Sequence, residues 1–208
     1  MYRAILIFFI SAGLLGLAGC GSPKPIKYYA VQIPTVPSPS NHTYAMDLVV
    51  GRITGSDLLG ATPIIYKTGT NEVGTYAYHR WTGAPTEMVH EKLIRLLRKS
   101  GEFRTVSGSE STTGAGSKSD AFVLRGKLYD FSEVDGSEIQ GLVSMEFELY
   151  NRAASKVVWT HFYSQTVPVK SKAVPAVVEA LDQNLDRGLN EVATGLSKYL
   201  AANPPGKS

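Results

Sequence analysis

The pattern that most restricts the fold of this chain lies near its C-terminal end. Between Val174 and Leu200, apolar residues recur at steps of three and four, as they do on one face of an α-helix. A helix with such a face must bury it against another layer, so the rest of the chain has to supply that layer. Gly188 and Gly195 interrupt the pattern, each at a cost of about 1 kcal/mol relative to Ala. They indicate either a close approach to another backbone or a weak point. The apolar positions are Val177, Val178, Leu181, Leu185, Leu189, Val192, Leu196 and Leu200.

Three segments before this helix have the composition of β-strands. Residues 122–134 and 156–167 are rich in β-branched and aromatic residues, and residues 142–150 alternate strictly between apolar and polar side chains. Such alternation predicts a strand with one buried face, and the short connections predict an antiparallel meander. The alternating strand places Val143, Met145, Phe147 and Leu149 inward, and Ser144, Glu146 and Glu148 outward.

The first half of the chain predicts further strands and one more helix. Residues 28–33, 46–53 and 103–106 favour strands, and residues 64–67 and 73–78 favour a hairpin. A helical pattern begins after Thr82, with Thr82 or Thr86 as the expected N-cap and Pro85 in the first turn. Gly101 is expected to end this helix.

Together these elements predict an α+β fold. We expect a single domain, residues 28–201, with a mainly antiparallel sheet and two amphipathic helices packed on one face. Residues 34–41 are rich in Pro, residues 107–120 are rich in Gly, Ser and Thr, and both are expected to be loops. Residues 202–208 are expected to form a flexible tail.

The N-terminal segment has the composition of a signal for export. Arg3 is its one charge, and an apolar run then leads to Leu17-Ala18-Gly19-Cys20. This ending resembles the lipobox of bacterial lipoproteins, in which the cysteine receives acyl chains and the preceding residues are removed. The resemblance implies a signal peptide at residues 1–19 and a lipidated Cys20. An uncleaved membrane anchor is the alternative, but the run is short for a membrane span.

Lipidation would explain why the chain contains a single cysteine. Several acyl chains on Cys20 would hold the protein on a membrane, because each buried CH₂ contributes about 0.8 kcal/mol. Residues 20–27 would then form a short tether. The residue after Cys20 is Gly21 and not Asp, which by the rule for diderm lipoproteins favours the outer membrane, facing the periplasm, over the inner membrane.

Composition and motifs argue against several other classes of function. The small formal net charge of +3 and the absence of a basic cluster with interleaved aromatic residues argue against nucleic-acid binding. The four histidines lack metal-ligand spacing, and no G-x-S-x-G or phosphate-binding motif is present. Glu146 and Glu148 share one strand face and are interpreted as an exposed face instead of an acid–base pair. We therefore expect no enzyme activity, no metal and no cofactor.

Two aromatic clusters are candidates for a contact surface. One surrounds Tyr78, Arg80 and Trp81, and the other includes Trp159. Core packing explains such clusters most simply. The alternative is that they contact a partner protein or a lipid, because aromatic residues and Arg are enriched at interfaces.

The order of these features resembles a known family. A lipobox is followed by Tyr28-Tyr29 in a predicted strand, and a hairpin then leads to Arg80-Trp81. Pro85 and an amphipathic helix come next. After Gly101, Phe103 and Val106 the chain continues with a strand meander and a final helix. This arrangement is similar to the ABC-type transport auxiliary lipoproteins, the PqiC-like family. One departure from this pattern is the glycine- and serine-rich segment of residues 107–120.

The resemblance implies a periplasm-facing lipoprotein without catalytic residues. Its partners would be an MCE-type protein and ABC permease components, with lipids or other hydrophobic compounds as cargo, and it would act as a tether and docking module. A lipid-binding carrier and a structural envelope lipoprotein are the alternatives. Assembly into a homo-oligomer is left open.

Overall fold

The computed structural model describes residues 23–32, 43–108 and 122–204. The predicted signal peptide, Cys20, the loop at 34–41, most of the segment at 107–120 and the end of the tail lie outside these residues. The helices among these residues are α2 (Pro85–Ser100) and α3 (Val174–Ala202). The strands are β1 (Lys27–Tyr29), β2 (Tyr44–Thr54), β3 (Pro63–Thr68), β4 (Glu72–Trp81), β5 (Phe103–Gly108), β6 (Phe122–Asp135), β7 (Gln140–Asn151) and β8 (Lys156–Pro168).

The strands of the described residues form one sheet around the long strand β6. On one side β6 pairs antiparallel with β7, which pairs antiparallel with β8, so the predicted meander is confirmed. On its other side the first half of β6 pairs with β2 and the second half pairs with β3. β2 continues to β5, and β3 continues through the hairpin to β4 and β1.

The α+β fold is confirmed, with one refinement of the sheet. The β6–β7, β7–β8 and β3–β4 pairs are antiparallel, whereas β1–β4, β2–β5, β2–β6 and β3–β6 are parallel. The longest pairings, those of β6 with β7 and of β7 with β8, are antiparallel, so the sheet is largely but not purely antiparallel. Parallel neighbours require a long crossover connection, and the parallel strands β2 and β5 are connected through β3, β4 and α2.

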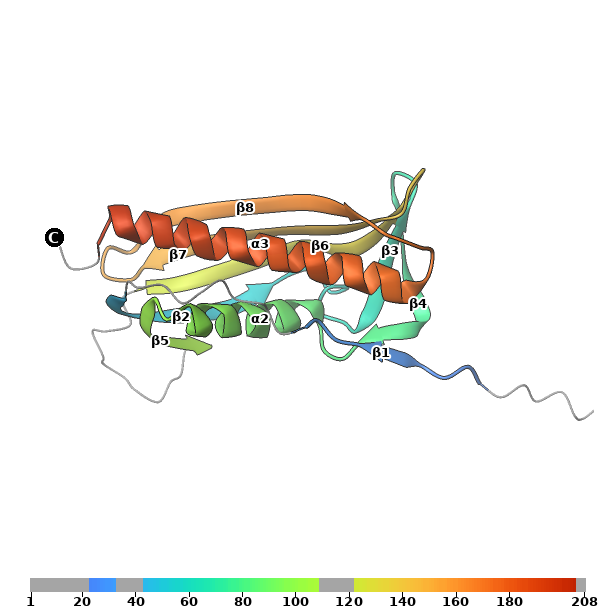
Figure 1. Ribbon diagram of the computed structural model, residues 1–208, viewed down its shortest axis with the longest axis horizontal. Helices are drawn as coiled ribbons and strands as arrows, with labels where there is room; N and C mark the ends of the chain where they lie inside the picture. Colours follow the sequence, from blue (N-terminus) through green and yellow to red (C-terminus); the bar gives the residue numbers. More distant parts are fainter. Residues whose placement is uncertain (1–22, 33–42, 109–121, 205–208) are drawn as a thin grey trace, which may run out of the picture.

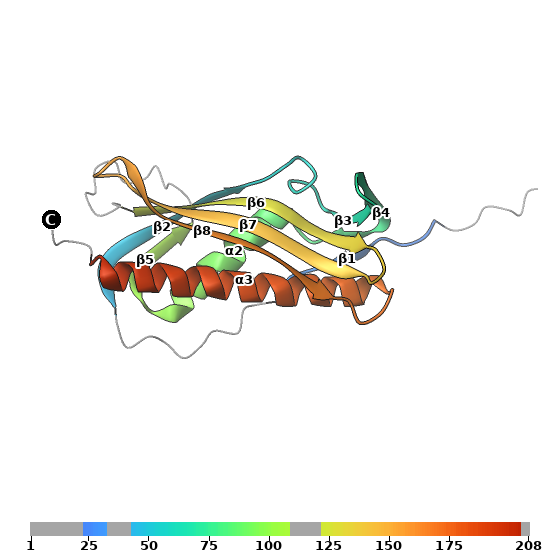
Figure 2. The same cartoon turned by 90° about the horizontal axis from the view of Figure 1, so that it is seen from above.

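Both helices cover the same face of the sheet, as predicted (Figures 1 and 2). α3 lies along β6, β7 and β8, and α2 lies on β2 and β5 beside α3. The predicted inward side chains of β7 are fully buried beneath α3. The stripe of α3 is also buried except for Val178, which is half-buried. A continuous cluster of buried apolar side chains fills the space between the sheet and the helices.

The ends of α2 test the predicted caps. Pro85 begins the helix, and Gly101 ends it in the left-handed conformation with φ of 67°, both as predicted. The N-cap prediction was wrong, because Ala84 occupies that position without a side-chain hydrogen bond. Proline at the first helical position lacks an N–H, which reduces the need for a side-chain cap.

The two glycines of α3 face side chains of the sheet. A Cβ at Gly188 would collide with the end of Met145 and come within 2.8 Å of the Tyr163 ring. A Cβ at Gly195 would lie 3.1 Å from the Trp159 ring. The predicted close approach to another backbone was therefore wrong, because the groups nearest to the two glycines are side chains of β7 and β8.

Candidate functional site

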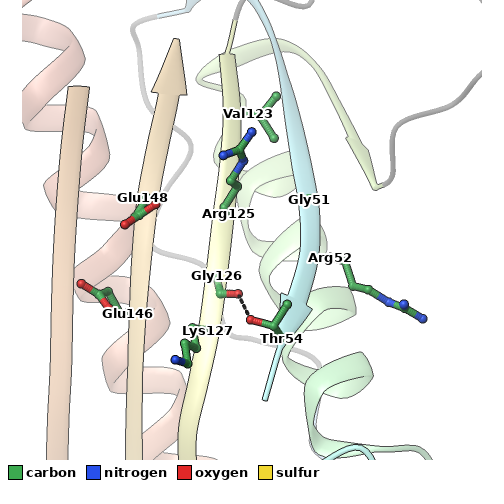
Figure 3. Close-up of a pocket in the computed structure, with 9 residues that line it drawn as sticks. All are labelled: Gly51, Arg52, Thr54, Val123, Arg125, Gly126, Lys127, Glu146 and Glu148. Carbon is green, nitrogen blue, oxygen red and sulfur yellow. Dashed lines mark hydrogen bonds between the residues drawn. The ribbon is translucent and has the colours of Figure 1, made fainter. Parts of the chain in front are cut away.

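The face of the sheet opposite the helices carries an open groove between β6, β7 and β2 (Figure 3). Its volume is about 690 Å³. Arg125 and Lys127 of β6 and Glu146 and Glu148 of β7 line it, and Gly51 of β2 borders the other side. The remaining lining residues are Arg52, Thr54, Val123 and Gly126.

The local sequence of β2 creates the space for this groove. Gly51 presents no side chain, although a Cβ there would fit at ordinary van der Waals distance, 3.5 Å from Val123 Cγ1. The register between β2 and β6 shifts between Val50 and Ile53, and beyond the shift Thr54 Oγ1 donates a hydrogen bond of 3.4 Å to the Gly126 carbonyl. The missing side chain and the register shift together leave the charged side chains of β6 and β7 accessible from the side of β2.

The register of β6 and β7 sets opposite charges against each other. Arg125 is paired with Glu148, and Lys127 is paired with Glu146. Cross-strand pairs of opposite charge stabilise a sheet by roughly 0.2–1 kcal/mol each. The groove therefore offers a row of cations beside a row of carboxylates, which suits a polar partner segment that carries both charges.

Aromatic rings hold the cations of the groove in place. The Arg125 guanidinium lies 4.1 Å from the centroid of the Tyr150 ring, and the Lys127 ammonium lies 4.8 Å from that of Tyr129. The Tyr129 hydroxyl donates a hydrogen bond of 2.6 Å to Glu146, and this bond raises the pKa of the Tyr129 phenol. These contacts restrict the rotamers of the cations, so that a partner would meet a partly ordered surface.

The aromatic surface continues past the groove onto the edge strand β8. Phe162 is 61% exposed and packs edge-on against Tyr129, with ring centroids 6.2 Å apart. An exposed Phe beside an ordered charged groove is typical of an interaction surface, because an apolar ring gains most when a partner covers it.

The groove lacks the features of a catalytic centre. Within the described residues, no group of three or more potential metal-ligating side chains comes together. Thr54 is the one hydroxyl among the groove-lining residues named above, and it donates its hydrogen bond to the Gly126 carbonyl. In the described part of the chain, no hydrogen bond joins this hydroxyl to a side chain that could act as a base. The arrangement can bind charged or polar groups, but it holds no activated nucleophile.

The four predicted contact residues differ in how far the structure exposes them. Trp81 is fully buried against Phe131, with ring centroids 5.1 Å apart, so core packing describes it and the contact-surface interpretation was wrong. Trp159 is half-buried, stacks on His161 and lies under α3. Tyr78 is 44% exposed and Arg80 is half-buried, both on β4.

The sequence pattern identified one row of the groove but not the groove itself. Glu146 and Glu148 were correctly interpreted as an outward strand face. Arg125 and Lys127 also alternate with apolar residues in β6, which was a usable signal. Their position opposite the glutamates depends on the register of the pairing, which the sequence does not display.

Neither described helix has the length and apolar composition that crossing a membrane requires. Cys20 and the rest of residues 1–22 are not among the described residues, so its predicted lipidation stays a prediction.

The family described as ABC-type transport auxiliary lipoprotein component matches residues 29–193. Protein XCC0632 from Xanthomonas campestris has a similar crystal structure, with a TM-score of 0.74 and 17% identity over 88% of this chain and 100% of that one. The crystal structure of an uncharacterized protein is also similar, with a TM-score of 0.63 and 12% identity over 83% of this chain and 99% of that one. At these identities the likeness shows the fold alone. No curated protein matches the sequence.

Proposed function

Because the chain belongs to the family of ABC-type transport auxiliary lipoprotein components, we propose that it serves an envelope transport system as a membrane-bound tether and docking module. The family match over residues 29–193 carries this proposal. It spans all elements of the described domain except the start of β1 and the end of α3. This family is one of transport components and not of enzymes, in keeping with a role in binding.

The proposed attachment point is Cys20. Residues 1–19 would be removed as a signal peptide, residues 20–27 would tether the domain, and acyl chains on Cys20 would enter the bilayer. Gly21 after the cysteine favours the outer membrane, with the domain facing the periplasm. The folded domain then begins at β1, directly after the tether.

The proposed docking surface is the charged groove on the uncovered face of the sheet. Its partner would be a periplasmic segment of an MCE-type protein or of an ABC permease. The ordered Arg125 and Lys127 and the exposed Phe162 support this assignment, because a partner segment could pair with the charges and cover the ring. The transported compound would be a lipid or another hydrophobic molecule.

A carrier that encloses a lipid between sheet and helices gains no support from the described residues. Buried apolar side chains fill that layer, and several have no exposed surface at all. A carrier of this kind would need a cavity there.

Charge reversal in the groove tests the docking proposal. The full-length protein is purified from bacterial membranes in detergent, and co-purified MCE-type and permease proteins are quantified by mass spectrometry. Arg125→Glu combined with Lys127→Glu should lower their recovery by tenfold or more, because buried like charges at an interface strongly oppose binding. Lys156→Glu, at the exposed start of β8, is the matched control and should leave recovery unchanged.

Three outcomes would contradict parts of the proposal. Equal recovery with the groove variant would refute this docking surface. A stoichiometric lipid in the purified domain, without these partners, would favour the carrier. An unmodified Cys20 in the mature protein would refute the tether.

A further inference from the structure

The end of the domain that receives the tether carries an exposed aromatic and basic surface. Tyr28 of β1 is 63% exposed, and Tyr78 of β4 is 44% exposed. Tyr28 is the register partner of Arg80 in the parallel β1–β4 pair. Because side chains alternate along a strand, Tyr28, Tyr78 and Arg80 lie on the same side of this pair. Trp81 points to the other side, into the core.

The residues just before β1 add to the same surface. The Lys24 ammonium lies 5.9 Å from the centroid of the Tyr78 ring, and Ile26 is 44% exposed. We call the set of Lys24, Ile26, Tyr28, Tyr78 and Arg80 the β1 patch. It combines two amphipathic rings, one apolar side chain and two cations, and contains no carboxylate.

This composition matches the interface between a bilayer and water. Tyrosine is enriched at headgroup depth, where its ring contacts acyl chains and its hydroxyl meets water. Lys and Arg near the surface are attracted to anionic headgroups. A protein partner would equally cover such residues, but the position of the patch in the chain favours the membrane.

The distance along the chain limits how far the patch can lie from the proposed anchor. Lys24 follows Cys20 by four residues. A fully extended chain spans at most about 3.6 Å per residue, so Lys24 can lie only about 14 Å from the cysteine. Acyl chains on Cys20 would therefore bring the patch to the headgroup region.

We propose that the β1 patch lies against anionic phospholipid headgroups and fixes the orientation of the domain on the membrane. This proposal depends on the proposed lipid anchor at Cys20. β1 lies at one end of the molecule and the C-terminal end of α3 lies at the other (Figures 1 and 2). The α3 helix spans about 44 Å, at 1.5 Å for each of its 29 residues. Its C-terminal end would thus point away from the bilayer.

A fluorescent label next to the membrane tests this orientation. The chain has one cysteine, and its acylated form would not react, so an introduced cysteine becomes the only free thiol. Full-length protein with Tyr78→Cys is labelled and reconstituted into vesicles of phosphatidylethanolamine and phosphatidylglycerol that contain brominated lipids. We expect strong quenching of this label. A label at Ala154→Cys, in the turn between β7 and β8, should not be quenched.

Matched variants test the role of the patch itself. With the label at position 78, Tyr28→Ser together with Lys24→Gln should reduce quenching about twofold or more, as should omission of phosphatidylglycerol. Val157→Ser removes an exposed apolar side chain elsewhere, on β8, and should leave quenching unchanged.

Flotation of the vesicles separates this proposal from the anchor on which it depends. Protein that floats with the vesicles but shows equal quenching at positions 78 and 154 would overturn the orientation and leave the anchor intact. Protein that does not float would refute the lipid anchor, and the orientation proposal with it.

Discussion

At the scale of single residues, Trp81 shows how an interface-type side chain can belong to the core. Its indole is fully buried against Phe131, at the end of β4 where the chain turns into α2. Its Nε1–H has no acceptor among the described residues. An unsatisfied buried donor costs about 1–3 kcal/mol, so part of the benefit of burying the ring is lost.

Substitution of Trp81 separates these two effects. Trp81→Ala should lower the free energy of unfolding by about 3–5 kcal/mol because it leaves a large cavity. Trp81→Phe should cost clearly less, since it removes the unsatisfied N–H and keeps an aromatic ring. Denaturant unfolding measures both values, and equal costs would contradict this account. Partner recovery with Trp81→Phe should match the wild type.

At the scale of elements, buried polar groups connect the helices to the tether end. The Lys92 ammonium of α2 is almost fully buried, pairs with Asp182 of α3 and lies 3.0 Å from Asp186. Both carboxylate oxygens of Asp182 also accept hydrogen bonds from the Gln32 backbone N–H, at 3.3 and 3.2 Å. One buried cluster thus joins α2, α3 and the segment that follows β1.

Removal of one charge from this cluster should lower the stability of the fold. Lys92→Ala should lower the free energy of unfolding by about 3–5 kcal/mol, because it leaves the largely buried Asp182 carboxylate without its cation. Lys92→Met combined with Asp182→Leu should cost less than the single change. Lys170→Ala breaks an exposed pair with Glu179 and should have no measurable effect. Hydrogen exchange at the Gln32 amide should accelerate only when Asp182 is replaced.

The contact between α3 and the sheet also depends on a glycine. Gly188→Ala should destabilise the protein by about 1–3 kcal/mol despite the higher helix propensity of Ala. The Tyr163 ring cannot move aside easily, because its hydroxyl donates a hydrogen bond of 2.6 Å to Asn184. Gly195→Ala meets only the edge of Trp159 and should be close to neutral. Thermal unfolding of the two variants tests this contrast, and equal melting temperatures would contradict it.

At the scale of the whole molecule, the half-buried Tyr76 and the buried Tyr163 predict a loss of stability at high pH. Burial, and then the hydrogen bond to Glu133, raises the pKa of Tyr76 well above its usual value of 10.0. Burial also raises the pKa of Tyr163. A raised pKa means that the unfolded chain loses these protons first. Stability is therefore fully present below about pH 10 and is lost as the pH rises through the folded-state pKa.

This alkaline loss can be measured by denaturant unfolding between pH 8 and pH 12. The slope of the unfolding free energy against pH should be smaller for Tyr76→Phe than for the wild type. Tyr28→Phe, which removes an exposed phenol, is the matched control and should keep the wild-type slope. A steep loss that Tyr76→Phe does not reduce would contradict the assignment.

The sequence alone indicated each strand and helix of the described domain, although the strand expected at residues 28–33 ends at Tyr29. The alternation in residues 142–150 and the stripe of α3 both result from burial on one side of the element. The spacing of apolar residues in the sequence therefore predicts these elements directly. Only the tertiary structure decided how the strands pair. The parallel contacts of β2 and β3 with β6, the position of Arg125 opposite Glu148, and the burial of Trp81 all depend on residues far apart in the chain. Such long-range contacts are set by the fit of whole layers, which no local pattern encodes.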